Sequence, residues 1–185
     1  MKKLLIAVMA ALTVGACGFE PLYVQKQHNN RWYFGGKFDA SVTQEMTQIK
    51  VNPIEGRFGQ QVRNDLIDLL TPKKVPSKPK YRLEVSLRSK TITQQAMRKD
   101  ITATSERVRY LVDYRLYQDS EEILKGDSVA NVSYNILANP YSTTMAQKKT
   151  DTDAARIIAD DIALRIGAYF HLKLSNRKED FSNDL

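Results

Sequence analysis

The sequence is poor in the residues that mark most metal and catalytic sites. It has one cysteine, Cys17, and two histidines, His28 and His171, among 185 residues. A single thiol excludes an internal disulfide, and no cysteines or histidines stand at metal-ligand spacing. The eight glycines form neither a phosphate-binding loop nor a Gly-x-Ser-x-Gly nucleophile turn. We therefore expect neither a metal ion nor an organic cofactor.

Adjacent acids are the remaining candidates for catalysis. Asp160-Asp161 and Glu121-Glu122 are such pairs. Adjacent side chains on a helix point apart, so the pattern favours solvated charges over a catalytic pair. The sequence therefore predicts a binding or assembly protein and not an enzyme.

The first seventeen residues have the pattern of an export signal. Met1-Lys2-Lys3 supplies positive charge, and the apolar run 4–14 is well short of the ~20 residues that a membrane-spanning helix needs. Gly15-Ala16-Cys17 follows and resembles a bacterial lipobox, in which small residues precede an obligatory cysteine. We predict that residues 1–16 are a signal peptide that is removed, and that Cys17 is lipidated.

Lipidation accounts for a lone cysteine in an exported chain. Three acyl chains, palmitate among them, would hold the protein on the membrane, because each buried methylene contributes ~0.8 kcal/mol. Gly18 stands where an aspartate would favour retention at the inner membrane, so the sorting pattern favours the outer membrane. The alternative, a small buried residue behind an ordinary export signal, stays open.

The charge balance is basic. The chain has 28 lysines and arginines against 21 acids, a formal net charge of +7, and removal of Lys2 and Lys3 with the signal leaves +5. A basic surface indicates an anionic partner. In a cell envelope that partner is lipid phosphate or an acidic protein surface, so we expect no nucleic acid.

Four segments are predicted along the chain. Residues 1–16 form the signal, 17–46 a lipidated tether and extended arm, 47–175 a single domain, and 176–185 a flexible charged tail. The aromatic cluster Trp32-Tyr33-Phe34 interrupts the polar arm, and we expect it to pack on the chain's own domain in preference to a partner.

Hydrophobic periodicity predicts the elements of this domain. Period-two alternation indicates strands, and apolar residues four apart indicate helices. A proline-rich basic loop over 72–79 follows the first helix, and Gln118-Asp119-Ser120 reads as a tight turn. The last helix is predicted to begin near Asp151, or as early as Thr144, and to end near Ser175. The predicted elements are strand 49–51, helix 58–70, strands 81–92, 108–116 and 123–136, and a helix whose apolar stripe runs over 155–170.

These elements predict an α+β fold. Two helices pack on one face of a four-stranded, mostly antiparallel sheet in the order β-α-β-β-β-α, because the loops between the long strands are too short for helical crossovers. The other sheet face is left exposed, and its alternating charged and aromatic side chains are available to a partner.

Several short motifs, in order along the chain, resemble one family. They are Cys17-Gly18-Phe19 with Pro21-Leu22-Tyr23, the segment Arg63-Asn64-Asp65-Leu66 in the first helix, Ser133-Tyr134-Asn135 at the end of the last strand, and Asp153-Ala154-Ala155-Arg156 in the final helix. Together with the element order, they resemble the lipopolysaccharide-assembly lipoproteins of the LptE family, in particular the alphaproteobacterial type.

The resemblance implies a non-enzymatic protein that plugs the LptD β-barrel at the outer membrane, helps that barrel fold, and assists insertion of lipopolysaccharide into the outer leaflet. The protein would be lipid-anchored on the periplasmic side or inside the barrel. Lysines and arginines would pair with lipopolysaccharide phosphates. By position, these are Arg98 and Lys99 between the second and third strands, and Lys148 and Lys149 before the last helix.

Other interpretations remain open. The four basic residues can equally be solvated loop residues. A helix-on-sheet lipoprotein can also be an auxiliary subunit of another envelope lipid or solute transporter, which would co-purify with an inner-membrane ATPase. A soluble periplasmic enzyme would show a pocket of converging acids with shifted pKa values.

Overall fold

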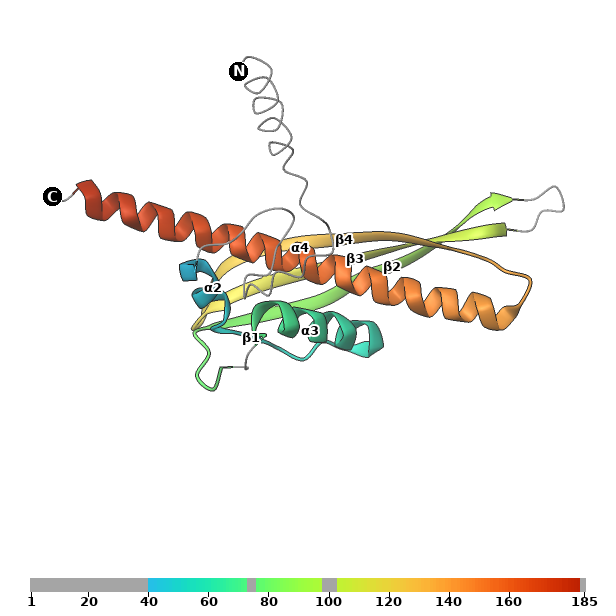
Figure 1. Cartoon of the computed structure of the whole chain (residues 1–185), viewed down its shortest axis with the longest axis horizontal. Helices are drawn as coiled ribbons and strands as arrows, with labels where there is room; N and C mark the ends of the chain where they lie inside the picture. The colour runs from blue at the N-terminus through green and yellow to red at the C-terminus, as the bar shows by residue number, and fades with distance from the viewer. Residues whose placement is uncertain (1–39, 73–75, 98–102, 184–185) are drawn as a thin grey trace, which may run out of the picture. The chain divides into compact units, whose positions relative to one another are not determined.

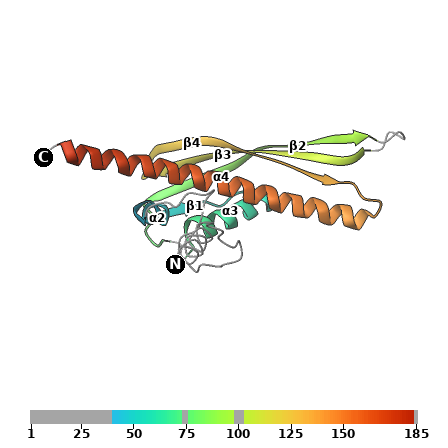
Figure 2. The same cartoon turned by 45° about the horizontal axis from the view of Figure 1, so that its top comes forward.

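The computed structural model describes residues 40–72, 76–97 and 103–183. In this part of the chain a mixed sheet has the strand order β1-β2-β3-β4. Strand β1 (Ile49–Val51) is parallel to β2 (Tyr81–Met97), while β2, β3 (Ala103–Gln118) and β4 (Glu121–Asn135) are antiparallel. Helices α2 (Ala40–Met46), α3 (Gly56–Leu70) and α4 (Pro140–Asn183) lie to one side of the sheet (Figures 1 and 2). The predicted α+β fold class is confirmed.

Helix α2 is an addition to the predicted element order. The sequence predicted an extended arm through residue 46, but the chain is helical from Ala40. Val42 and Met46, one helical turn apart, are 1% and 4% exposed, and α2 packs against α4. Two buried residues in a seven-residue helix are too few to establish a period in sequence. The rest of the predicted arm, with Cys17 and Trp32-Tyr33-Phe34, lies outside the described residues.

Strands β2 and β3 are longer than predicted. Their pairing extends to Met97 and Ala103, whereas the sequence predicted strands over 81–92 and 108–116. The register shifts between Leu87 and Ser89. Leu87 alternates with the buried Tyr81, Leu83 and Val85, but it is 40% exposed because β1 ends at Val51 and leaves this part of β2 at the sheet edge. These extensions carry polar residues on both faces, so the sequence shows no period-two hydrophobic pattern there.

Helix α4 begins earlier and ends later than predicted. Asn139 caps it, since its side-chain oxygen accepts a hydrogen bond from the backbone N–H of Tyr141 at 2.9 Å, and Pro140 occupies the first helical position. The sequence predicted a start near Asp151 or as early as Thr144. The helix continues to Asn183, beyond the predicted end near Ser175. That residues 176–185 form a flexible tail stays a prediction.

The core lies between the sheet and the helices. On α4, small and large residues alternate: Ala155, Ala159 and Ala163 let the helix approach its neighbours, while isoleucines fill the space between them. The tight turn between β3 and β4 is confirmed, with Asp119 at φ 54°, a left-handed conformation that aspartate tolerates. The α4 residues that are 0–1% exposed are Ala154, Ala155, Ile158, Ala159, Ile162, Ala163, Ile166 and Phe170.

Candidate functional site

The predicted basic residues divide into two groups. Arg98 and Lys99 lie outside the described residues. Lys148 and Lys149 lie within α4, two turns after its start, and not in a loop before the helix as predicted. Their environment is therefore set by a helix and not by a flexible connection.

Lys148 and Lys149 are both exposed but differ in their charge environment. The Nζ atom of Lys149 lies 2.5 Å from an oxygen of Asp153, one turn further along the helix, and its side chain is 76% exposed. Such a solvent-exposed ion pair contributes less than about 1 kcal/mol to the stability of the fold, yet the carboxylate offsets the charge of the lysine locally. Lys148 makes no ion pair within the part of the chain that the structure describes.

The elements that flank these residues converge at one end of the sheet. Met97 pairs with Ala103 on either side of residues 98–102, and Ser105 pairs with Asn135 at the end of β4. The connection from β4 to α4 leaves from this same end (Figure 1). The described ends of β2, β3 and β4 therefore lie at one end of the sheet. That the four predicted basic residues form one binding site stays a prediction.

A cluster of polar and aromatic residues fixes this part of α4 to the sheet. The hydroxyl of Tyr110 donates a hydrogen bond to Asp151, which follows Lys149 by two residues. The Nζ atom of Lys90 lies 3.4 Å from the same carboxylate and 5.1 Å from the centre of the Tyr110 ring. The ring also stacks on Phe58 of α3, with ring centres 4.1 Å apart. The cluster thus holds β2, β3, α3 and α4 together.

Burial and a neighbouring carboxylate both raise the pKa of the two tyrosines in and near this cluster. Burial, followed by the hydrogen bond to Asp151, raises the pKa of Tyr110. Burial, followed by the hydrogen bond to Glu106, raises the pKa of Tyr134 to about 12. Both phenols therefore stay protonated at neutral pH and serve as hydrogen-bond donors.

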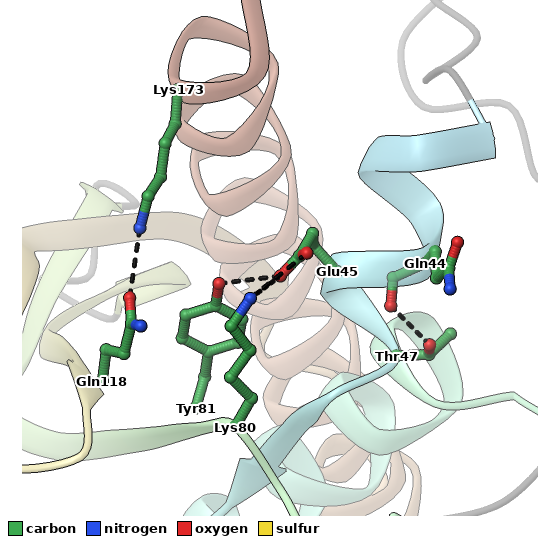
Figure 3. A network of polar contacts seen from close by, with 7 residues as sticks. All are labelled: Gln44, Glu45, Thr47, Lys80, Tyr81, Gln118 and Lys173. Carbon is green, nitrogen blue, oxygen red and sulfur yellow. Dashed lines mark hydrogen bonds and ion pairs between the residues drawn. The ribbon is translucent and has the colours of Figure 1, made fainter. Parts of the chain in front are cut away.

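A second polar network lies at the opposite end of the sheet (Figure 3). Glu45 of α2 accepts a hydrogen bond from the hydroxyl of Tyr81 at 2.7 Å and one from Lys80 Nζ at 3.0 Å. Burial acts to raise the pKa of Glu45, but the hydrogen bonds from Tyr81 and Lys80 outweigh it, and the pKa is lowered. Lys173 of α4 donates to Gln118 of β3 at 3.1 Å. The network joins α2 and α4 to the sheet.

The sheet face opposite the helices carries two different kinds of surface. Near the β3–β4 turn, its charges are paired: Arg88 lies 2.5 Å from Asp113, and Arg115 lies 3.7 Å from Glu122. Toward the free end of the β2–β3 hairpin lie Arg107 and Arg109, both exposed and without an ion pair among the described residues. The alternation of β3 predicted a charged outward face, but not that one half of it lacks paired acids.

A polar groove of about 730 Å³ lies where β1 ends. It is bounded by residues 52–56, residues 84–87 of β2, and Asp113 and Arg115 of β3. The acid with a raised pKa is Asp65, in which burial outweighs the opposing effect of Arg156, and it lies outside this groove. Among the described residues, the groove and the carboxyl group with the raised pKa therefore lie at different places.

Two further observations concern metals and membrane spans. No three or more histidine, cysteine, aspartate or glutamate residues of the described segments are grouped so as to hold a metal ion. Within those same segments, no helix is both long enough and apolar enough to cross a bilayer.

Similar proteins share both sequence and architecture with this chain. An uncharacterized protein of Rickettsia prowazekii (strain Madrid E) is 27% identical over 168 residues, which cover 90% of this chain and 96% of the relative. A crystal structure of a lipoprotein from Caulobacter crescentus CB15 matches with a TM-score of 0.59 and 26% identity, covering 70% of this chain and 96% of that one.

A more distant structure shows the same fold. Rare lipoprotein B from Shewanella oneidensis has a TM-score of 0.50 and 14% identity, with 69% of this chain and 96% of that chain covered. The lipopolysaccharide-assembly family LptE matches residues 46–166, from the end of α2 to the buried part of α4. With the helix-on-sheet architecture, this match places the chain in the LptE family of lipopolysaccharide-assembly lipoproteins.

Proposed function

We propose that this protein is an outer-membrane lipoprotein, anchored through Cys17, whose domain plugs the LptD β-barrel, helps it to assemble, and assists insertion of lipopolysaccharide into the outer leaflet. The observation that carries the proposal is the family match over residues 46–166, which includes every strand of the sheet. The role requires no catalytic step, since a plug acts by binding and by excluding solvent from the barrel.

The distribution of charge supports a partner that bears phosphates. The chain has a net charge of +7, and Lys148 and Lys149 project from the part of α4 that the Tyr110–Asp151 contact fixes. Basic side chains on a fixed helix lose less conformational freedom on binding than those on a free loop. Arg98 and Lys99, which lie outside the described residues, would complete this site in the proposal.

Affinity purification from membranes tests the proposed partnership. A C-terminally tagged chain is recovered from detergent-solubilised membranes, with a second tagged lipoprotein of the same envelope as the matched control. We expect a large outer-membrane β-barrel in near one-to-one amount with this chain and not with the control. Recovery of an inner-membrane ATPase complex would support the auxiliary-subunit alternative instead, and recovery of neither would contradict both.

A further inference from the structure

Arg107 and Arg109 lie in two successive cross-strand rows on the sheet face opposite the helices. Arg109 is paired with Thr91 of β2 and with Asn131 of β4, and Arg107 is paired with Thr93 and Ser133. The two arginines are two residues apart on one strand, so they point to the same face with their Cα atoms about 7 Å apart. Arg107 is thus flanked by two hydroxyl residues, and Arg109 by one hydroxyl and one amide residue.

No carboxylate belongs to these two rows. Glu106 precedes Arg107 on β3, but alternation turns it to the helix side, where it accepts the hydrogen bond from Tyr134. Elsewhere on the same face, Arg88 has Asp113 as its partner. The two guanidinium groups therefore repel each other without a compensating acid among the described residues, and an anion placed between them would remove that repulsion.

We propose that this arginine surface, formed by Thr91, Thr93, Arg107, Arg109, Asn131 and Ser133, binds a phosphorylated saccharide. Guanidinium groups bind phosphate through two parallel hydrogen bonds. The neighbouring hydroxyls and amide both donate and accept hydrogen bonds, which matches the hydroxyls of a sugar. An acidic protein surface would pair with the arginines but would leave the uncharged polar side chains beside them without a specific role.

The inference rests on the proposed function and extends it. Lys148 and Lys149 belong to a helix on the other side of the sheet, so the arginine surface is a separate contact for the saccharide phosphates of lipopolysaccharide (Figure 2). A flat sheet face that is open along its length can bind a ligand reversibly while that ligand passes, without the closure that a deep pocket requires.

The test measures binding of the full chain to lipopolysaccharide micelles. The variant Arg107→Gln with Arg109→Gln keeps polar side chains but removes two charges. The matched control, Arg115→Gln with Lys125→Gln, removes the same charge from the half of the face where Glu122 compensates it. We expect the first variant to weaken binding by about tenfold or more and the control to change it less than about twofold, because a phosphate contact is lost only in the first.

Two further probes identify the recognised chemistry. Lipopolysaccharide treated with phosphatase should bind wild type and the Arg107/Arg109 variant equally. Vesicles containing phosphatidylglycerol should not distinguish the two proteins, because they offer phosphate without the phosphorylated sugar. Equal loss on those vesicles, or equal loss in the charge-matched control, would overturn the proposal in favour of general electrostatic attraction.

The same preparations separate this proposal from the proposed function. If the Arg107/Arg109 variant binds micelles as tightly as wild type while both recover the β-barrel, the arginine surface is wrong and the proposed function stands. If wild type neither recovers the barrel nor binds the micelles, both are wrong. Circular dichroism and thermal unfolding of each variant show whether the fold is retained.

Discussion

The hydroxyl of Tyr110 donates a hydrogen bond to Asp151 and so joins the central strand β3 to helix α4. The Tyr110 side chain is 0% exposed, and its ring stacks on Phe58 of α3. The Asp151 carboxylate also forms an ion pair with Lys90 of β2. One tyrosine therefore contacts the elements that surround it through both its ring and its hydroxyl.

Tyr110→Phe should lower the free energy of unfolding by about 1.5–3 kcal/mol. The substitution keeps the ring on Phe58 and removes one hydrogen bond to a charged group, leaving a carboxylate oxygen less well satisfied. Urea unfolding measures the change. The control is Tyr141→Phe, at a tyrosine that is 72% exposed, where we expect a change within about 0.5 kcal/mol. Equal effects in the two variants would show that the Asp151 contact contributes little.

Glu45→Gln should reduce stability at neutral pH, and the difference from wild type should shrink in acid. The folded-state pKa of Glu45 is lowered from its ordinary value of 4.5 by Tyr81 and Lys80, which outweigh burial. A lowered pKa contributes stability that is present above the unfolded-state value and is lost as the pH falls through the folded-state value. Urea unfolding from pH 7 down to about pH 3 measures the difference between the two proteins across the range in which this carboxyl titrates.

Glu121→Gln is the control for that series, because it removes an exposed acid that makes no ion pair among the described residues. The stability difference between this variant and wild type should stay nearly constant with pH. A Glu45→Gln difference that grew on acidification would contradict the sign of the pKa shift.

The larger elements followed from the sequence because their periods are long and regular. Alternation over β3 and the stripe on α4 each report one buried face over many residues. Helix α2 was missed because seven residues contain only two buried positions. The start of α4 was missed because a proline can either break an element or occupy the first position of a helix, and the hydrogen bond from Tyr141 N–H to Asn139 shows that Pro140 does the second.

The two basic surfaces differ in how far sequence could indicate them. Lys148 and Lys149 were singled out by position within the family resemblance, with no contact to support them. Arg107 and Arg109 alternate along β3, but the absence of an acid beside them depends on the register with β2 and β4. Cross-strand register is set by the buried face of the strands in the folded sheet, so the polar outward residues alone do not indicate which of them become neighbours.

Cys17→Ser should release the protein from membranes. Serine supplies no thioether, so the acyl chains that would each contribute ~0.8 kcal/mol per buried methylene are absent. Fractionation of cells into membrane and periplasm measures the change, and metabolic labelling with palmitate reports the acyl chain itself. The control, Gly18→Asp, should keep the label and move the protein toward the inner membrane. A Cys17→Ser protein that stays fully membrane-bound would contradict the lipid anchor.

Lys148→Gln should weaken binding to lipopolysaccharide micelles more than Lys149→Gln does. The charge of Lys149 is offset by Asp153 at 2.5 Å, and a phosphate must compete with that carboxylate, whereas Lys148 makes no ion pair among the described residues. We expect about a threefold to tenfold loss for Lys148→Gln, since an exposed lysine contributes roughly 1 kcal/mol to such contacts. Lys125→Gln, on the opposite face and 3.7 Å from Glu122, is the control for loss of one charge. Equal losses in all three variants would mean that the micelles respond to net charge alone, and that Lys148 is a solvated residue of α4.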